Sequence, residues 1–216
     1  MGAKPLNSFM SWVGGKKALR EQIVRLFPAQ YERYIEVFGG GGWVLFHKNP
    51  GRDFEVYNDR NSLLVNLYRC VQEKPEELKA ALKYALNSRE EFERIRAALA
   101  RDSPASDVQK AAWYYQIIRY SYASALTSFA GRPHDMWDNF PLIDRAHRRL
   151  AKVVIENQDF EALIRHYDRE QWLLYRRGHL LRHSHQRLRH RVYGHCRICG
   201  DCVPNRSEQG AVRGYL

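Results

Sequence analysis

The chain has 216 residues, of which 44% are hydrophobic, and a formal net charge of +11. This length suits one substantial domain, or one domain with an inserted subdomain. No apolar run approaches the roughly 20 residues of a membrane span, and the N-terminus lacks the apolar core of a secretory signal, so we expect a cytoplasmic protein without a membrane anchor.

The positive charge is concentrated in the last fifth of the chain. Residues 176–216 hold nine arginines, no lysine and two acids, whereas residues 1–175 are only mildly basic. A mildly basic body permits binding to a polyanion such as nucleic acid without requiring it.

Strand and helix patterns alternate along the first part of the chain, and helical patterns dominate the middle. The expected elements are, in chain order, a helix over 16–27, a strand over 34–38, a helix from 43, a strand over 54–57, a helix over 62–72, helices through 75–120 with a break at 102–106, a loop over 121–141, a basic helix over 142–150, a strand over 152–156, a helix over 159–167 and a strand over 172–175. The order strand, turn, helix, strand, turn, helix is typical of a parallel α/β sheet.

Four glycines, Gly39 to Gly42, follow the first predicted strand and precede a helix. Such a turn lets the backbone approach a ligand closely, and the helix N-terminus offers free N–H groups. Asp59 lies 20 residues past Gly39, where an acid accepts hydrogen bonds from a nucleoside ribose. The alternative for Asp59, a helix-capping role, stays open. Val44 breaks the dinucleotide fingerprint G-x-G-x-x-G, which disfavours a nucleotide-dependent oxidoreductase, and no P-loop follows.

Three stretches together resemble the Dam-like (D12 class) DNA adenine-N6 methyltransferases. They are W-V-G-G-K at 12–16, Y-I-E-V-F-G-G-G-G at 34–42, where Val37 replaces the family's proline, and Y-N-D-R-N at 57–61. V-V-I-E-N-Q-D-F at 153–160 is similar to a fourth family segment. The resemblance implies an α/β, Rossmann-like S-adenosylmethionine-dependent methyltransferase sheet with a helical DNA-recognition insertion. It places the cofactor-binding core at 1–72 and 151–175 and the target-recognition insertion at 73–150.

The resemblance also implies which residues hold the cofactor, S-adenosylmethionine. Trp12 and Lys16 would contact its amino-acid part, Asp59 its ribose, and Asp159 with Phe160 would border the adenine. The full expected set is Trp12, Lys16, Glu36, Phe38, Gly39, Gly40, Gly41, Asp59, Asp159 and Phe160. A core tryptophan, a solvated lysine and a capping Asp159 are the structural alternatives.

By the same resemblance, the partner is double-stranded DNA, whose target adenine is flipped out of the duplex. Residues of the predicted loop and basic helix carry suitable donors and acceptors for phosphates and base edges. The expected DNA-binding residues are Ser124, Thr127, Ser128, Arg132, Asn139 and Arg148, and Arg145 and Arg149 complete a basic patch with Arg148. We expect a monomer of the restriction–modification or prophage kind.

The family's catalytic signature is missing from this chain. After the strand that corresponds to 172–175 the family places Asp-Pro-Pro-Tyr, whose Asp side chain and first proline carbonyl accept the two N–H groups of the adenine amine. This chain has Arg176-Arg177-Gly178-His179 there, so we assign no catalytic residue and expect the methyltransferase sheet to be incomplete after about four strands. A divergent, non-catalytic DNA- or cofactor-binding remnant is one explanation. A reading-frame shift near residue 175 is the other, and the abrupt change to Arg, His and Cys without Lys favours it.

Residues 176–216 form an Arg-, His- and Cys-rich tail without resemblance to the family. Cys196, Cys199 and Cys202 with a histidine have thiolates for zinc, but all these ligands lie in one short run, whereas zinc sites usually pair two separated ligand groups. We therefore expect no metal. Cys70 stands alone in a predicted helix and is expected to pack inside.

Overall fold

A computed structural model describes residues 5–51 and 53–167, and the backbone of residues 172–176 and 179–182. The elements are α1 (Arg20–Arg25), β1 (Arg33–Glu36), α2 (Trp43–His47), β2 (Phe54–Asn58), α3 (Ser62–Glu73), α4 (Pro75–Leu82), α5 (Arg89–Ala100), α6 (Asp107–Tyr120), the short 3₁₀ helices η1 (Tyr122–Ser124) and η2 (Met136–Asn139), α7 (Phe140–Leu150), β3 (Val154–Glu156), α8 (Phe160–Tyr167), β4 (Trp172–Arg176) and β5 (His179–Arg182). No described helix is both long and apolar enough to cross a membrane.

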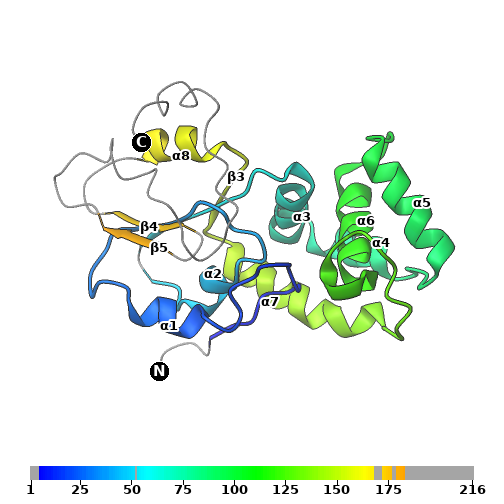
Figure 1. Ribbon diagram of the computed structural model, residues 1–216, viewed down its shortest axis with the longest axis horizontal. Coiled ribbons are helices and arrows are strands. Elements are labelled where there is room, and N and C mark those ends of the chain that lie inside the picture. The colour runs from blue at the N-terminus through cyan, green and yellow to red at the C-terminus, as the bar shows by residue number, and fades with distance from the viewer. Residues whose placement is uncertain (1–4, 52, 168–171, 177–178, 183–216) are drawn as a thin grey trace, which may run out of the picture. The chain divides into compact units, whose positions relative to one another are not determined.

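The strands form one mixed sheet in the order β3-β2-β1-β4-β5. Strands β3, β2, β1 and β4 run parallel, and β5 pairs antiparallel with β4. In Figure 1, α8 lies on one face of the sheet and α1 and α2 lie on the other. A parallel sheet with helices on both faces confirms the α/β class predicted from the sequence.

Two boundaries differ from the predictions. The expected helix over 16–27 is helical only over Arg20–Arg25, because no side chain caps its start and residues 16–19 form turns. The described sheet also has a fifth strand, β5, which pairs antiparallel with β4 and lies beyond the four strands expected from the sequence. Alternation of strand and helix does not predict this strand, since its sequence lies in the basic tail.

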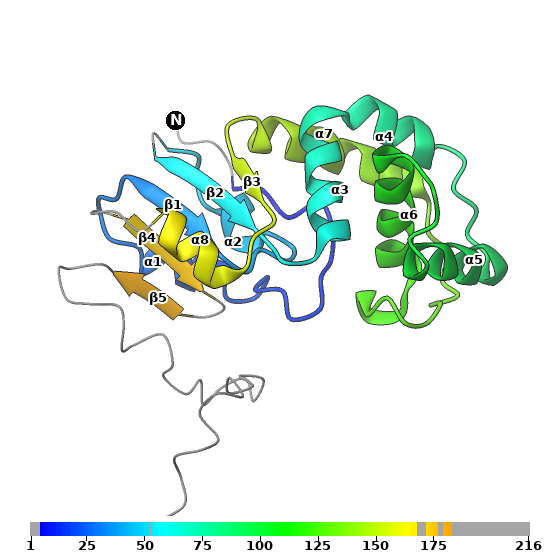
Figure 2. The same ribbon diagram turned by 90° about the horizontal axis from the view of Figure 1, so that it is seen from above.

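Helices α3 to α7 lie between β2 and β3 in the chain. Helix α6 is at the centre of this group and packs against α3, α4 and α5, while α7 packs against α3 and α4. Figure 2 shows α4, α5 and α6 beside α3 on the side away from the sheet. The break predicted at 102–106 separates α5 from α6, where the side chain of Ser106 caps α6 by accepting the N–H of Gln109.

An aromatic cluster joins the helices to the sheet. The stacked rings of Tyr57 and Tyr68 lie 3.9 Å apart, and the ring of Phe9 meets that of Tyr68 edge to face. Both tyrosine hydroxyls donate to the carbonyl of Gly40, at 2.7 and 3.1 Å. Burial raises the pKa of both phenols well above the ordinary value, so both remain donors at neutral pH. The core therefore holds the glycine turn directly.

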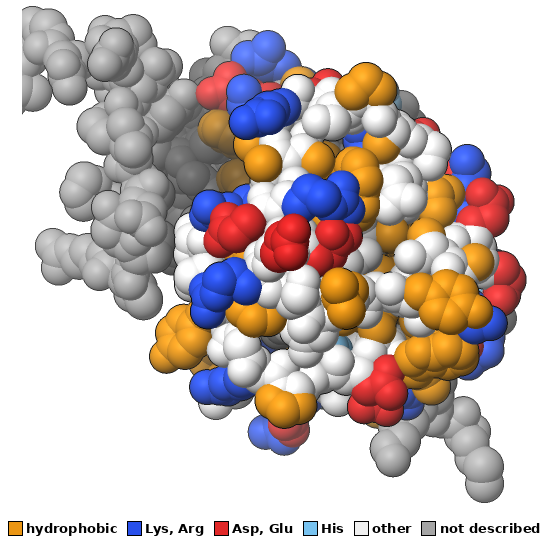
Figure 3. Space-filling model, turned by 90° about the vertical axis from the view of Figure 1, so that its right-hand side faces the viewer, with side chains coloured by type: hydrophobic (Ala, Val, Ile, Leu, Met, Phe, Trp, Pro, Cys, Tyr) orange, Lys and Arg blue, Asp and Glu red, His pale blue; other side chains and the backbone are white. Residues whose placement is uncertain are grey.

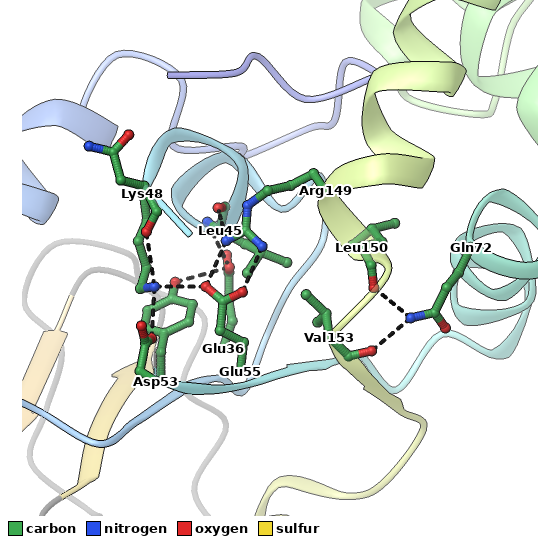
Figure 4. A network of polar contacts seen from close by, with 11 residues as sticks. Glu36, Leu45, Lys48, Asp53, Glu55, Gln72, Arg149, Leu150 and Val153 are labelled. Carbon is green, nitrogen blue, oxygen red and sulfur yellow. Dashed lines mark hydrogen bonds and ion pairs between the residues drawn. The ribbon is translucent and has the colours of Figure 1, made fainter. Parts of the chain in front are cut away.

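A buried ion cluster anchors the end of α7 to the sheet (Figure 4). The guanidinium of Arg149 makes two 2.6 Å bonds to the carboxylate of Glu55 in β2 and donates to the carbonyl of Leu45 at 2.9 Å. Lys48 pairs with Glu55 and with Asp53, both at 2.7 Å. Arg149 is only 7% exposed. The prediction that it belongs to a phosphate-contacting surface is therefore wrong, because its charge is satisfied inside the protein.

Candidate functional site

The glycine turn leaves the sheet where β1 ends at Glu36. Gly40 and Gly42 have φ of 49° and 61°, a conformation that favours glycine, and Gly42 is the N-cap of α2. The carbonyl end of the strand is fixed by Asn58, whose side-chain amide donates to the carbonyls of Val37 and Gln158. The turn is thus held by neighbouring strand ends as well as by the tyrosines below it.

The segment 12–16 packs over this turn. A Cβ built on Gly40 lies 2.8 Å from the indole of Trp12, and one built on Gly41 lies 2.9 Å from the Cβ of Trp12. A Cβ on Gly15 lies 2.7 Å from the ring of Trp43. Both stretches therefore need glycine for close approach to a tryptophan. Gly14 has φ of 70° and nothing within 4 Å of its Cβ position, so it borders open space.

A cavity of about 310 Å³ lies between these two segments and the end of β2. Its lining includes Trp12, Lys16, Glu36, Phe38, Gly39, Gly40, Gly41 and Asp59 together with Val13, Gly14, Gly15, Trp43 and Asn61. The three motifs separated in the sequence therefore meet at one cavity. Eight of the ten residues expected to hold a cofactor line it.

The helix-capping role that the sequence left open for Asp59 is taken by its neighbour Asn61. Asn61 caps α3 by accepting the N–H of Leu64 at 3.2 Å. Asp59 accepts the N–H of Gly40 and the N–H of Asn61, both at 2.9 Å. A carboxylate has about four lone-pair sites, so Asp59 retains acceptor capacity toward the cavity.

Glu36 forms part of the cavity wall from inside the sheet. Its Oε2 accepts the hydroxyl of Tyr34 at 3.0 Å and the N–H of Leu45 at 3.1 Å, which ties α2 to β1. Burial raises the pKa of Glu36 to about 8. The hydrogen bonds from these two donors lower the pKa, but by less than burial raises it. The carboxyl is therefore largely protonated at neutral pH.

Replacing Glu36 by Gln is expected to remove a pH dependence of stability. The folded pKa of about 8 lies above the ordinary 4.5, so the folded state holds a proton that the unfolded state releases between these values. Stability consequently falls as pH rises from about 4.5 to 8, by about 1.4 kcal/mol for each unit between the two pKa values. Urea unfolding between pH 6 and 9 should show this fall in wild type and a flatter profile in Glu36→Gln. The exposed Glu32→Gln is the control, and parallel profiles for wild type and Glu36→Gln contradict the prediction.

Asp159 and Phe160 lie at the start of α8 and do not line the cavity. The carboxylate of Asp159 accepts the N–H of Glu161 at 3.0 Å and pairs with Arg60 at 2.5 Å. The ring of Phe160 lies 5.9 Å from that of Phe38, which does line the cavity. Phe160 therefore packs against Phe38, and Asp159 takes the capping position at the start of α8.

Five of the six expected DNA-binding residues are accessible. Ser124 is half-buried, and Thr127, Ser128, Arg132 and Arg148 are exposed. Asn139 is the exception at 1% exposure. Its amide donates to the carbonyl of Met136 and lies 2.8 Å from Nε2 of His134, so it braces the loop internally and is withdrawn from the expected DNA contacts.

The C-terminal end of β4 emerges beside the cavity. Strand β4 runs parallel to β1, with Tyr175 opposite Glu36. In a parallel sheet the carboxyl ends of neighbouring strands meet at one edge, so Arg176 follows the same edge as the glycine turn. The backbone register thus places Arg176 where the resemblance requires the catalytic Asp.

A comparison with known families matches residues 12–176 to the D12 class N6 adenine-specific DNA methyltransferases. The chain belongs to this family. The resemblance drawn from the motifs is confirmed, and the matched region ends where β4 ends.

Three curated relatives carry the names of methyltransferases or methylases. The type II methyltransferase M1.LlaDCHI of Lactococcus lactis subsp. cremoris is 34% identical over 121 residues, which cover 54% of this chain and 42% of the relative. The DNA N-6-adenine-methyltransferase of Escherichia phage P1 is 42% identical over 65 residues, 30% of this chain and 8% of the relative. The modification methylase StsI of Streptococcus sanguinis is 29% identical over 72 residues, 33% of this chain and 11% of the relative. The chain thus matches less than half the length of each.

Sequence reasoning missed five residues that line the cavity, namely Val13, Gly14, Gly15, Trp43 and Asn61, and one that braces it, Asn58. Gly14, Gly15 and Asn61 stand inside quoted motifs, so the motifs were the signal for them. Trp43 follows the glycines directly, and the cations of Arg20 and Lys17 lie 5.4 and 5.6 Å from its ring centroid. Asn58 also stands inside a quoted motif, Y-N-D-R-N at 57–61, which was the signal for it.

The metal and thiol expectations have different outcomes. No group of three or more possible metal ligands occurs in the part of the chain that the structure describes. Cys196, Cys199 and Cys202 lie outside that part. The prediction for Cys70 is confirmed, since it is buried in α3 and burial raises the pKa of its thiol to about 11.

Proposed function

We propose that the cavity between segment 12–16 and the glycine turn binds S-adenosylmethionine, and that the chain presents it to adenine N6 in double-stranded DNA. The convergence of the three motifs on one cavity carries this proposal. The family match supports the reaction class, transfer of a methyl group to the adenine amine. The names of the relatives support a place in restriction–modification.

The residues present fit this cofactor. The glycine backbone leaves a cradle that side chains would fill, and Asp59 keeps acceptor sites for two ribose hydroxyls. Lys16, whose ammonium donates to the carbonyl of Gly14 at 3.2 Å, supplies a cation for the carboxylate of an amino-acid tail. S-adenosylmethionine, when bound, supplies an electrophilic methyl group on a sulfonium. The protein residues bind and orient it, and Phe38 with Phe160 behind it borders the adenine side.

We infer a division of labour along the chain. Residues 1–72 and 151–175 build a Rossmann-like cofactor-binding core, and residues 73–150 form the target-recognition insertion. Ser124, Thr127, Ser128, Arg132 and Arg148 are the proposed DNA contacts, because their polar or basic side chains are accessible. Residues 176–216 are a tail without resemblance to the family, and the protein acts as a cytoplasmic monomer.

Asp59→Ala is expected to weaken cofactor binding by about 10- to 100-fold. The substitution removes charge-assisted hydrogen bonds to the ribose and frees the N–H of Gly40, and such bonds contribute roughly 1.5–3 kcal/mol each. Isothermal titration calorimetry with S-adenosylmethionine measures the change. Glu90→Ala, at an exposed acid in the first turn of α5, is the control.

Wild-type protein that shows no heat of binding at millimolar cofactor contradicts the cofactor proposal. Equal affinity of wild type and Asp59→Ala contradicts only the role of Asp59. Thermal unfolding of both proteins in the absence of cofactor checks that the turn still folds.

A non-catalytic remnant that binds cofactor or DNA is the second candidate function. The observation that favours it is Arg176 at the end of β4, one residue past Tyr175, which pairs with Glu36 at the end of β1. It keeps the same cofactor cavity and the same DNA partner but lacks the transfer step.

A further inference from the structure

A second cavity, of about 220 Å³, lies in the helical part of the protein. Its lining comes from the end of α6, from η1 and from residues 130–134, and consists of Arg119, Tyr120, Ser121, Tyr122, Ala123, Ser124, Ala130, Arg132, Pro133 and His134. Two arginines and a histidine therefore face one hollow. No acid belongs to the lining among the described residues.

The basic groups of this cavity are not neutralised within the described part of the chain. Arg119 has a buried Nε without a hydrogen-bond partner there, and its guanidinium lies 5.7 Å from the ring centroid of Tyr115. An N–H buried without an acceptor costs roughly 1–3 kcal/mol, so the Nε of Arg119 is an unused donor within the described residues. Arg132 is exposed at the rim.

His134 presents a donor as well. The amide nitrogen of Asn139 lies 2.8 Å from Nε2 of His134 and also donates to the carbonyl of Met136, which fixes its orientation. Because an amide nitrogen only donates, Nε2 accepts and the ring proton is on Nδ1. Burial, and then the charge of Arg119, lower the pKa of His134, and this lowering exceeds the raising effect of Asp138 and Asp135. The ring is therefore a neutral donor. Asp135 and Asp138 lie outside the lining.

The charge pattern of the cavity differs from that of the neighbouring helices. On the face shown in Figure 3, acidic and basic side chains are intermixed. On α5, Arg94 pairs with Glu91 and Arg96 pairs with Glu93, both at 2.6 Å. Paired charges of this kind attract a polyanion weakly, whereas an unpaired cluster in a hollow focuses the field.

The second cavity is close to the cofactor cavity. Ser124, in its wall, is hydrogen-bonded at 2.6 Å to Ser11, the residue before Trp12. On α6, Tyr114 accepts a hydrogen bond from Asn61 of the cofactor cavity at 2.8 Å, and Arg119 is five residues further along the same helix. At 1.5 Å per residue this is about 7.5 Å along the helix axis. Helix α6 and the bond between Ser124 and Ser11 therefore link the walls of the two cavities.

The backbone of η1 is strained at this wall. Ala123 and Ser124 in η1, and Leu126 two residues after it, have φ between 51° and 65°, which residues other than glycine seldom adopt. Such residues persist where the surrounding structure fixes them, and they cluster at ligand sites. Here Leu126 N–H donates to the hydroxyl of Ser121, and Tyr122 N–H donates to the carbonyl of Ser128.

We propose that this cavity binds one backbone phosphate of DNA near the target adenine, with Arg119 and Arg132 as its charged donors and His134 as a neutral one. The inference rests on the proposed function, because DNA is the partner. It adds Arg119 and His134 to the DNA interface and assigns Arg132 to the same phosphate.

The test is the salt dependence of DNA binding, measured by fluorescence anisotropy on a labelled 24-base-pair duplex. Loss of one phosphate contact lowers the slope of log K against log salt by about 0.9. Arg119→Gln is expected to weaken binding about tenfold at low salt and to lower the slope by that amount. Arg101→Gln, which removes the same charge from an exposed site at the end of α5, should leave both unchanged.

The double variant Arg119→Gln/Arg132→Gln tests whether the two arginines share one phosphate. If they share one phosphate, the slope of log K against log salt for the double variant lies within a few tenths of the slope for a single variant. The losses of affinity are then not additive. Slopes that fall by about 0.9 for each substitution overturn the shared site. A folded Arg119→Gln protein with wild-type affinity and slope overturns the cavity proposal.

Two further results separate this inference from the proposed function. Wild-type protein that does not bind the duplex at any salt concentration contradicts the DNA partner itself. If Arg119→Gln does not fold, as judged by circular dichroism, the imidazole NMR signals of His134 in wild type provide the answer. They should shift during titration with the duplex, and unchanged signals at saturation overturn the proposal.

Discussion

Methyl transfer from S-adenosylmethionine to DNA is expected to be absent from this chain, even where cofactor and DNA both bind. The family resemblance requires an Asp after the strand that is β4 here, and a proline carbonyl next to it, to accept the two N–H groups of the adenine amine. The parallel pairing of Tyr175 with Glu36 puts the last residue of β4 at the edge of the cofactor cavity. The sequence has Arg176 in that place.

An arginine cannot substitute for this group. Its guanidinium has five donors and no acceptor, so it cannot orient the lone pair of the amine. A guanidinium also repels the positive sulfonium of the methyl donor. No Pro-Pro dipeptide occurs anywhere in the 216 residues. Removal of one positioned hydrogen-bonding group from an active site commonly lowers the rate by 10²–10³ or more, and here both acceptors are missing.

The assay is transfer of a labelled methyl group to unmethylated DNA, with cofactor and DNA binding measured on the same preparation. Binding without transfer is the expected result. Robust transfer contradicts the interpretation of Arg176 and favours a different acceptor in the cavity. The nucleotide sequence around codon 175 distinguishes the two origins of the missing motif. A shifted frame that continues without similarity to the family rejects the reading-frame hypothesis.

The cofactor cavity was largely predictable from the sequence because its residues are contiguous in three short motifs. What the motifs could not decide was the role of each acid and amide. Asp59 and Asn61 are both good helix caps, and only the geometry shows that Asn61 caps α3 while Asp59 holds the N–H of Gly40. Helix-capping propensity is similar for Asp and Asn. Asp59 lies within hydrogen-bond distance of Gly40, 19 residues earlier, and the capping position is therefore left to Asn61.

Long-range partners explain the two surface predictions that failed. Arg149 follows Arg148 in a basic run, and helical periodicity alone does not show that its partner is Glu55, which is 94 residues earlier in the chain. Asn139 was predicted in a loop over 121–141 but lies in the 3₁₀ helix η2, where its amide lies 2.8 Å from His134. The sequence indicated the helix of Arg149, and in both cases tertiary contacts decided the direction of the side chain.

Glu55→Ala is expected to destabilise the protein by about 3–5 kcal/mol. The substitution removes the carboxylate that pairs with both Arg149 and Lys48, and it leaves the guanidinium buried with one carbonyl, that of Leu45, as its partner. Breaking a buried pair from one side is costly because the remaining charge is desolvated without compensation. Urea unfolding at neutral pH measures the loss. Glu21→Ala, which breaks the exposed pair of Glu21 and Arg25, should cost less than about 1 kcal/mol.

The double substitution Glu55→Leu/Arg149→Met separates the cost of an unpaired charge from the value of the pair. Both charges are then absent, and Lys48 keeps its ion pair with Asp53. Apolar replacements of a buried pair are commonly neutral or stabilising, so the double variant should recover most of the stability that Glu55→Ala loses. A double variant as unstable as Glu55→Ala would instead show that the hydrogen bonds of Arg149 are themselves needed. The guanidinium of Arg149 donates to the carbonyl of Leu45, and the N–H of Leu45 donates to Glu36 in the wall of the cofactor cavity. Cofactor affinity measured on the same two proteins then tells whether the anchorage of α7 extends to the binding site. A loss confined to the double variant comes from the missing Arg149 to Leu45 bond, which Glu55→Ala retains.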